Sequence, residues 1–332
     1  MTKIAALEAG THRPAPFDDR RFANAAGTGV HGWADALKFM RTRQPERWPR
    51  HAGNDPAPRP ADRIDDGTIR VTVVGHATVL LQVGGLNILT DPVLSPRIGP
   101  YSWLGVKRVR PPALAFADLP RIDVVLVSHD HYDHLDRPTL AALERRDAPL
   151  VLTGLKAGRK IPAARIVELD WWESREIGNR MVATYVPAEH FSGRGLFDRN
   201  ASLWGGFVIE TAAGPVYFAG DTGDGPHFAA IRNRFGPMSV SLIPIGAYAP
   251  RWFMAAVHID PAEAVAASLA LESRLSIAIH FGTFPLADDG IDAAPLALAD
   301  AVAAVQAAGE HIDFRLPVFG RPIVVAREEL VA

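Results

Sequence analysis

Residues 128–136, with the sequence SHDHYDHLD, carry the side chains that most clearly could do chemistry. They directly follow the apolar run at 124–127, which predicts a buried strand because it is short and rich in β-branched residues. Imidazole and carboxylate are the ligands that borderline divalent metals prefer. Four such side chains fall too close together for a single tetrahedral ion to use them all: His129, His131, Asp133 and His134. The segment therefore predicts two neighbouring metal ions.

His190, Asp221 and His280 each stand at or just beyond the end of a β-rich run. Strand ends that face one edge of a sheet can converge, so we expect these side chains to join the histidine-rich segment. We predict two sets of ligands with Asp221 as the bridge between them: His129, His131 and His190 on one ion, and Asp133, His134 and His280 on the other. Each ion then keeps a position for a shared water, as catalytic metal sites do.

The predicted pair of metals indicates hydrolytic chemistry. Two ions about 3.5–4 Å apart lower the pKa of a bridging water to near neutrality and can stabilise both oxygens of an in-line displacement. The isolated histidines elsewhere are expected to be surface or hydrogen-bonded residues instead of ligands: His12, His31, His51 and His311.

The composition narrows the classes of function. The 332 residues carry a formal net charge of −2 at pH 7, so no overall positive field would attract nucleic acid. There are no cysteines, which leaves only nitrogen and oxygen ligands for a metal. No apolar run approaches the length of a membrane span, and the first residues lack the apolar core of a signal peptide. We therefore expect a cytoplasmic protein.

Segments rich in β-forming residues begin at Ile69 and alternate with helical segments toward the C-terminus. The pair Gly84 and Gly85 between two such runs predicts a hairpin. Three helices are expected further along the chain: 226–235, 261–271 and 295–308. Asp260 and Glu263 supply a capping box for the second of them. Without a glycine-rich phosphate-binding motif, this order predicts sheets covered by helices instead of a nucleotide-binding fold.

Residues 1–66 are rich in proline, glycine, arginine and aspartate, and we expect them to wrap around a catalytic domain at 67–332. Trp33, Leu37 and Met40 are spaced as on one face of a helix. We expect this face to pack on the core, with a lid or a membrane-facing stripe as the alternative.

Several segments resemble the metallo-β-lactamase superfamily, and within it the zinc phospholipases D that hydrolyse N-acyl-phosphatidylethanolamine. The segments that carry this resemblance lie between residues 69 and 287: GHATVLLQ, LTDPVLS, SHDHYDHLD, ELDWWE, FAGDTG, IPIGAYAPRWFM, HIDPAEA and AIHFGTFPLA. The resemblance implies an α/β (α+β) protein with a four-layer αββα sandwich. It also implies two zinc ions per chain, held by the seven ligands named above.

The same resemblance implies further site residues. Tyr132 and His258 match positions that contact the phosphate region of the substrate, and we expect Asp133 and His258 to act in catalysis. His76 and Asp91 lie in matching segments, where they either support the ligands or touch the substrate. A basic stretch is expected to be a solvated face, with the steering of anionic head groups as the alternative: Arg97, Lys107, Arg108 and Arg110.

The resemblance predicts a zinc phosphodiesterase of the phospholipase D type, which acts on N-acyl-phosphatidylethanolamine-like lipids or on small phosphodiesters. A lactonase or another acyl hydrolase on the same fold is the main alternative. An iron redox protein is disfavoured because diiron relatives usually carry an acid where His131 stands. A closed structural zinc site would favour four ligands, often thiolates. Peripheral contact with a membrane and a homodimer are left open.

Overall fold

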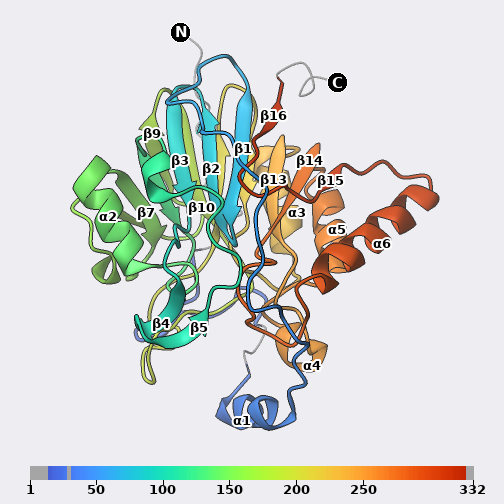
Figure 1. Ribbon diagram of the computed structural model, residues 1–332. Coiled ribbons are helices and arrows are strands. Elements are labelled where there is room, and N and C mark those ends of the chain that lie inside the picture. The colour runs from blue at the N-terminus through green and yellow to red at the C-terminus, as the bar shows by residue number, and fades with distance from the viewer. Residues whose placement is uncertain (1–13, 28–30, 327–332) are drawn as a thin grey trace.

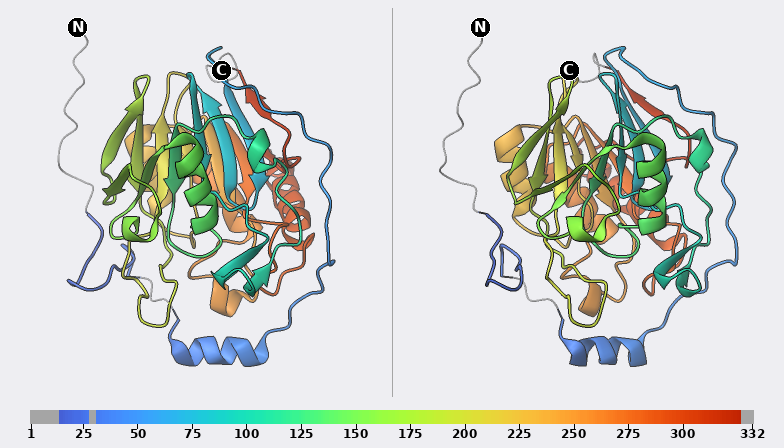
Figure 2. Two further views of the ribbon diagram at one scale, coloured as in Figure 1. Left: turned by 60° about the vertical axis from the view of Figure 1, so that its left-hand side comes forward. Right: turned by 90° about the vertical axis from the view of Figure 1, so that its left-hand side faces the viewer.

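The structure is a computed structural model that describes residues 14–27 and 31–326. Two seven-stranded sheets lie face to face, and helices cover their outer sides (Figures 1 and 2). The described N-terminal residues run around this body as a long loop that is interrupted by one helix (Figure 2).

The first sheet joins an antiparallel meander to a set of parallel strands. Its strands, in spatial order, are β16 (Ile323–Val325), β1 (Ile69–Gly75), β2 (Thr78–Val83), β3 (Leu86–Thr90), β6 (Val124–Val127), β7 (Leu150–Gly154) and β8 (Ile166–Leu169). The strands from β16 to β3 pair antiparallel, and those from β3 to β8 pair parallel. The predicted hairpin joins β2 to β3. Gly84 and Gly85 form its turn with positive φ angles of 53° and 75°, which suit a two-residue turn between twisted strands.

The second sheet has a similar mixture of pairings. Its strands, in spatial order, are β15 (Phe314–Arg315), β14 (Leu275–Ile279), β13 (Val240–Pro244), β12 (Val216–Phe218), β11 (Gly206–Glu210), β10 (Met181–Val186) and β9 (Ser174–Gly178). The strands from β9 to β12 pair antiparallel, and those from β12 to β15 pair parallel. Strands β10, β12 and β14 therefore all run in one direction. A separate hairpin consists of β4 (Arg97–Tyr101) and β5 (Leu104–Lys107).

Six α-helices are found among the described residues. They are α1 (Trp33–Thr42), α2 (Arg137–Asp147), α3 (His227–Phe235), α4 (Arg251–Met254), α5 (Pro261–Ala270) and α6 (Ala293–Ala307), with short 3₁₀ turns at Phe116–Asp118 and Gly158–Lys160. The predicted capping box of α5 is present: Asp260 accepts from the Glu263 N–H and Glu263 accepts from the Asp260 N–H, both at 2.9 Å. Helix α3 corresponds to the predicted helix at 226–235, and Gly236 follows it directly with a φ of 78°.

The residues of β6 show how the layers are held together. Val124 and Leu126 pack in the core between the two sheets, whereas Val125 and Val127 pack in a second core beneath α2. Helices α3, α5 and α6 cover the outer face of the second sheet through a third core. The predicted αββα sandwich is confirmed.

Two elements near the site are absent from the prediction. Helix α2 follows the histidine-rich segment, where Pro138 and several charged residues obscure the apolar periodicity. Strand β13 lies in the middle of the second sheet, and its Ser241 interrupts an otherwise apolar run.

Helix α1 is present as predicted, but its apolar face does not pack on the core. Leu37 and Met40 are 52% and 64% exposed, so the expected core packing is wrong. The side chain of Trp33 is not among those described. Helix α1 lies beyond the ends of the sheets (Figure 1), where no layer covers its outer face. Phe39 attaches it to the body by stacking on Phe253, with ring centroids 4.6 Å apart.

The segment after α1 is held by side-chain hydrogen bonds to the catalytic body. Trp48 donates its indole N–H to the Asp289 carbonyl at 2.9 Å, and Gln82 donates to the Ala61 carbonyl at 2.8 Å. The division at residues 66 and 67 stays a prediction. No helix among the described residues is both long enough and apolar enough to cross a membrane.

Candidate metal centre

The histidine-rich segment begins where β6 ends, and both sheets hold its first residue. Asp91, just after β3, accepts hydrogen bonds from the Ser128 backbone N–H at 2.7 Å and from Ser128 Oγ at 2.5 Å. Tyr185 of β10 donates its hydroxyl to the Ser128 carbonyl at 2.7 Å. Asp91 Oδ2 also lies 2.6 Å from His134 Nδ1 and so orients that ring. Of the two roles considered for Asp91, these contacts favour support of the candidate ligand His134, and the role stays a prediction.

His190, Asp221 and His280 lie beyond the carboxyl ends of β10, β12 and β14. Because these strands run in the same direction, their ends meet at one edge of the second sheet, where they face the histidine-rich segment. The structure thus brings all seven predicted ligands together. His131 and Asp133 are half-buried and the other five are buried. Their role as ligands stays a prediction.

The first predicted set consists only of imidazoles. His131 Nδ1 lies 2.8 Å from His129 Nε2 and 3.2 Å from His190 Nε2. One ring nitrogen from each of the three lies within 4.8 Å of the others, which is close enough for one metal ion. The Val257 carbonyl lies 2.8 Å from His190 Nδ1 and leaves its Nε2 facing the other two rings.

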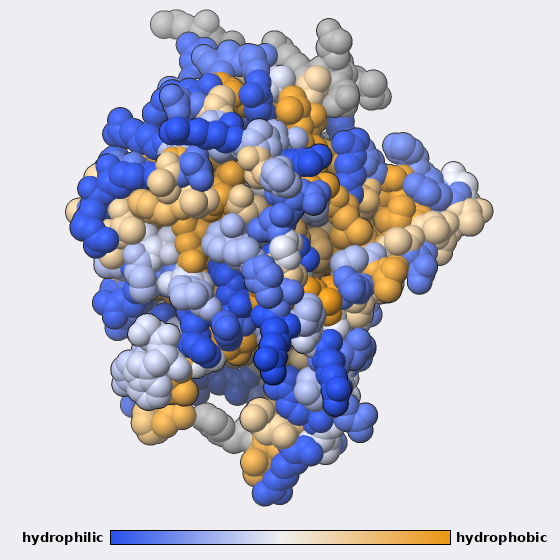
Figure 3. Space-filling view, viewed as in Figure 1, coloured by the Kyte–Doolittle hydropathy of each residue, from blue (hydrophilic) through white to orange (hydrophobic). Residues whose placement is uncertain are grey.

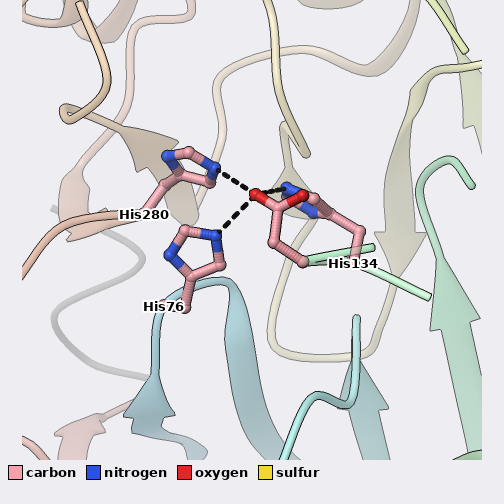
Figure 4. A group of neighbouring side chains, drawn as sticks. His76, His134 and His280 are labelled. Carbon is pink, nitrogen blue, oxygen red and sulfur yellow. Dashed lines mark hydrogen bonds and ion pairs between the residues drawn. The ribbon is translucent and has the colours of Figure 1, made fainter. Parts of the chain in front are cut away.

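The second predicted set gains a residue that was not assigned to it. Asp133 Oδ2 lies 3.4 Å from His134 Nε2, 3.5 Å from His280 Nε2 and 3.1 Å from His76 Nε2. Figure 4 shows the three labelled imidazoles pointing at this one carboxylate. His76 stands in the turn between β1 and β2 with a φ of 57°, and its backbone N–H donates to Thr283 Oγ1 at 3.0 Å. The backbone therefore holds this ring against the centre.

Asp221 occupies the position expected of a bridge. Its Oδ2 lies 3.1 Å from His134 Nε2 and 3.2 Å from His280 Nε2, both in the second set. The same oxygen lies 3.8 Å from His190 Nε2 of the first set. One carboxylate thus reaches both groups of imidazoles.

Several buried atoms of the candidate ligands form no hydrogen bond within the described part of the chain, among them Nε2 of His134, Nε2 of His280 and Oδ1 of Asp221. These two ring nitrogens lie close to Asp221 Oδ2 but make only ion-pair contacts with it. A buried polar atom without a partner costs about 1–3 kcal/mol, so several of them in one place indicate a ligand that binds there. Divalent cations fit this set of nitrogen and oxygen donors.

Burial and neighbouring charges shift the pKa values of the candidate ligands in opposite directions. Burial lowers the pKa of His129 and of His190 well below the usual range, so both imidazoles are neutral near pH 7. Burial also lowers the pKa of His134, but the neighbouring carboxylates, Asp221 first, outweigh it and raise that pKa well above its usual value. Burial would raise the pKa of Asp133 and of Asp221, but the histidines beside them hold both well below the usual range. The carboxylates are ionised, as metal binding requires.

The structure places the two predicted substrate residues differently. His258 is 8% exposed, and its ring centroid lies 5.1 Å from that of His190. Its Nδ1 is 3.9 Å from Asp221 Oδ2, so His258 borders the centre directly. Tyr132 instead donates its hydroxyl to the Arg194 carbonyl at 2.8 Å, and the Arg194 guanidinium covers its ring at 3.9 Å. Contact of either residue with the substrate stays a prediction.

Two residues of the predicted basic stretch, Arg108 and Arg110, form hydrogen bonds with backbone carbonyls. Arg108 is 7% exposed and donates to the carbonyls of Val93 at 2.6 Å and Ser95 at 3.0 Å. Arg110 donates to the Gly282 carbonyl at 3.0 Å. The expected solvated face is therefore wrong for these two arginines, because backbone carbonyls of the loops that surround the centre bind them.

A second charged cluster supports the histidine-rich segment and was not predicted. Asp130 is fully buried, binds Lys160 and Ser202 Oγ, and accepts from the Gly193 N–H at 2.7 Å. Arg194 donates to the Asp130 carbonyl at 2.8 Å. The residues after His190 are thereby bound to the loop that carries the first set. His12 lies outside the described residues.

A family model described as the beta-lactamase superfamily domain matches residues 86–281, which is more than half of the chain. The chain belongs to the metallo-β-lactamase superfamily. Igni18, a solved structure described as a novel metallo hydrolase from Ignicoccus hospitalis, matches with a TM-score of 0.58 at 20% identity, over 78% of this chain and 98% of that one. A likeness at this identity shows the fold alone.

Two relatives are more similar to this chain in sequence than Igni18 is. The N-acyl-phosphatidylethanolamine-hydrolyzing phospholipase D 1 of Caenorhabditis elegans is 40% identical over 228 residues, 65% of this chain and 64% of that protein. A UPF0173 metal-dependent hydrolase of Pyrobaculum islandicum is 31% identical over 216 residues, 64% of this chain and 84% of that protein. The match to the worm protein thus spans less than two thirds of its length.

Proposed function

We propose that this protein is a metal-dependent hydrolase that uses two zinc ions to cleave a phosphodiester bond, as a phospholipase D does, in lipids like N-acyl-phosphatidylethanolamine. The observation that carries the proposal is the position of Asp221, whose Oδ2 lies 3.1 Å from His134 Nε2 and 3.8 Å from His190 Nε2. A carboxylate shared by two imidazole-rich groups suits a pair of ions. The worm relative, by its name, supports the choice of lipid.

In this proposal some side chains would hold the metal ions and another would form a hydrogen bond with the substrate. The three imidazoles of the first set would hold one ion: His129, His131 and His190. Asp133, His134 and His280 would hold the other, with Asp221 between them. The bound pair would supply an ionised water at neutral pH and positive charge beside the phosphoryl oxygens.

His258 is placed to act on the oxygens of the substrate. Burial lowers its pKa to about 4, so its imidazole is neutral near pH 7 and carries one N–H. Arg251 donates to the His258 carbonyl at 2.8 Å and pairs with Glu263 at 2.6 Å, which holds the residue in place. The N–H of this neutral ring can donate a hydrogen bond to a phosphoryl oxygen beside Asp221 and keeps its proton. One such donor commonly contributes about 10²–10³-fold to the rate.

The proposal includes peripheral contact with a lipid surface. Leu196 and Phe197, in the loop that follows His190, are 71% and 90% exposed. Leu37 and Met40 on α1 are exposed as well, and that helix also carries the exposed cations Lys38 and Arg41. Figure 3 shows apolar surface over α1 at the lower end of the molecule. Apolar side chains beside cations suit an anionic membrane surface.

The test compares bond types on one preparation. Purified protein is assayed with N-acyl-phosphatidylethanolamine in mixed micelles, with bis(p-nitrophenyl) phosphate and with a lactone, and its metals are measured by mass spectrometry. We expect phosphatidic acid and an N-acylethanolamine as products, with two zinc ions per chain. Cleavage of the lactone alone would support the acyl-hydrolase alternative. Iron with a visible absorption band would contradict zinc.

The expected cytoplasmic location stays a prediction, and the homodimer stays open. Light scattering after size-exclusion chromatography would test the second of them.

A further inference from the structure

A cavity of about 370 Å³ opens beside the histidine-rich segment, outside both sets of candidate ligands. Three arginines from separate parts of the chain line it: Arg97 of β4, Arg137 at the start of α2, and Arg194 from the loop after His190. Tyr132 lines the cavity and stands in the chain between the predicted ligands His131 and Asp133.

Arg194 is fixed rigidly at the inner side of this cavity. Its Nη1 donates to the carbonyls of Asp130 at 2.8 Å and Leu135 at 2.7 Å, and its guanidinium stacks on Tyr132. Among the described residues, no acceptor takes a hydrogen bond from its Nε or Nη2. One edge of this guanidinium is thus bound by the protein, and the other edge is left for a ligand.

The other two arginines stand nearer to solvent. Within the described part of the chain, the Arg97 side chain makes one hydrogen bond, from Nη1 to the Gly105 carbonyl at 2.6 Å. Arg137 is exposed and has neither a hydrogen bond nor an ion pair with any described residue. Burial lowers the pKa of Arg194; Asp130 and Asp136 raise it, and the positive charge of Arg137 lowers it.

The cavity lacks enough negative charge to balance these cations. Asp136 is the only carboxylate among the described residues that line it. Its Oδ2 already accepts from the Ser95 N–H at 3.1 Å and from Thr139 Oγ1 at 2.5 Å. Three guanidinium groups against one carboxylate leave a local excess of positive charge, which a bound anion would neutralise.

We propose that this cavity is a second anion site, which binds the phosphate group of a phospholipid while the metal centre acts on its substrate. Guanidinium forks match the geometry of phosphate oxygens better than point charges do. That the bound phosphate belongs to a phospholipid rests on the proposed function, whereas binding of an anion in this cavity does not.

The far end of β4 favours a bilayer lipid over free phosphate. That strand leads from Arg97 at the cavity to Tyr101, which is 60% exposed at the tip of the β4–β5 hairpin. Trp103 and Leu104 beside it are 72% and 46% exposed, and Tyr101 stacks on Trp103 with centroids 5.5 Å apart. Aromatic side chains of this kind favour the level of lipid head groups. A hairpin tip at that level would place the arginines among the phosphates.

Inorganic phosphate tests the site without any lipid. Metal-loaded wild-type protein, an Arg97→Gln/Arg137→Gln variant and an Arg145→Gln control are titrated with phosphate by calorimetry. Arg145 is an exposed residue in the last turn of the same helix α2. We expect the double variant to bind at least one phosphate about tenfold more weakly, with the control unchanged. Identical titrations of all three proteins would overturn the proposal. Metal content on the same samples shows that the metal centre is intact, and Arg194 is left unchanged because it supports the histidine-rich segment.

Vesicles then identify the source of the phosphate. The same three proteins are sedimented with vesicles of phosphatidylcholine, with and without phosphatidylglycerol. Each arginine near an anionic surface contributes about fivefold to binding, so we expect the double variant to lose roughly tenfold or more on the anionic vesicles. If phosphate binding depends on the arginines but vesicle binding does not, the lipid source is wrong and the anion site stands. Phosphate binding that persists in a protein without hydrolytic activity would reject the proposed function alone.

Discussion

The metal pocket buries polar side chains, whereas the surface around it exposes apolar ones. In the pocket, five of the seven candidate ligands are at most 3% exposed, and their carboxylates and imidazoles face one another. Around it, large apolar side chains are exposed on α1, on α4, on the β4–β5 hairpin and in the loop after His190: Leu37, Met40, Tyr101, Trp103, Leu104, Leu196, Phe197 and Trp252. We call these eight residues the apolar rim. On the proposed function this difference separates two tasks: the buried polar groups would carry out the chemistry, and the exposed apolar groups would contact the lipid.

The largest effect is expected from Asp221→Ala. Because this carboxylate reaches both groups of imidazoles, its loss should weaken both metal sites at once. Residues that only support a ligand change metal affinity by about 10–100-fold, so the loss of the shared ligand should exceed about 100-fold. Metal content and turnover of a soluble phosphodiester are the measurements. Asp224→Ala, an exposed acid in the same loop, is the control. Two zinc ions retained in the Asp221 variant would contradict the ligand assignment.

His258→Ala should separate the hydrogen bond to the substrate from metal binding within the pocket. We expect both metal ions to remain and kcat to fall by about 100-fold, because His258 is not a predicted ligand and the other imidazoles beside Asp221 are. Metal analysis and steady-state kinetics check this result, with the exposed His311→Ala as the matched variant. A loss of metal equal to that of the Asp221 variant would make His258 a ligand.

Asp91→Asn tests whether the carboxylate that orients His134 contributes to metal affinity. The carboxylate orients His134 and binds Ser128, so its neutralisation should weaken metal affinity by about 10–100-fold without removing any ligand. Competition with a chromogenic chelator measures the affinity. Asp118→Asn, at an exposed position, should behave as wild type.

A pH dependence is expected from His227, which lies behind the loop of Asp221. Burial lowers its pKa to about 3, from an ordinary value near 6.5. The unfolded state then binds a proton that the folded state does not, so this residue destabilises the fold as the pH falls below about 6.5. Between pH 8 and pH 5 the loss amounts to about 2 kcal/mol. Denaturant unfolding of His227→Gln at both pH values should show a smaller acid loss than wild type by that amount. An equal loss in both proteins would show that His227 is protonated in the fold.

The smallest effect is expected from the apolar rim. Leu37→Ser combined with Met40→Ser removes two half-exposed apolar groups, and we expect binding to lipid vesicles to fall by about tenfold. Turnover of a soluble phosphodiester should not change, because α1 lies at the edge of the molecule (Figure 2). Equal losses on soluble and lipid substrates would remove the distinction between the pocket and the rim.

Much of the pocket could be predicted from the chain because its ligands follow strands. A buried strand places the residue after its last hydrogen bond at the edge of the sheet, so His129, His190, Asp221 and His280 could be expected to meet. His76 could not be assigned in this way, because it stands in a tight turn that the pairing of β1 with β2 creates. Arg194 could not be predicted either, since its partners are backbone carbonyls of a loop about sixty residues earlier.

The sequence by itself determined the types of ligand, the segments that carry them and the layered class of fold, since these follow from local periodicity and from the chemistry of single side chains. Only the tertiary structure decided that β10, β12 and β14 end at the same edge, that Arg108 is bound by backbone carbonyls, and that the apolar face of α1 is left uncovered. The physical reason is that strand direction and burial depend on contacts between residues far apart in the chain. An apolar stripe has the same spacing whether a second layer covers it or not.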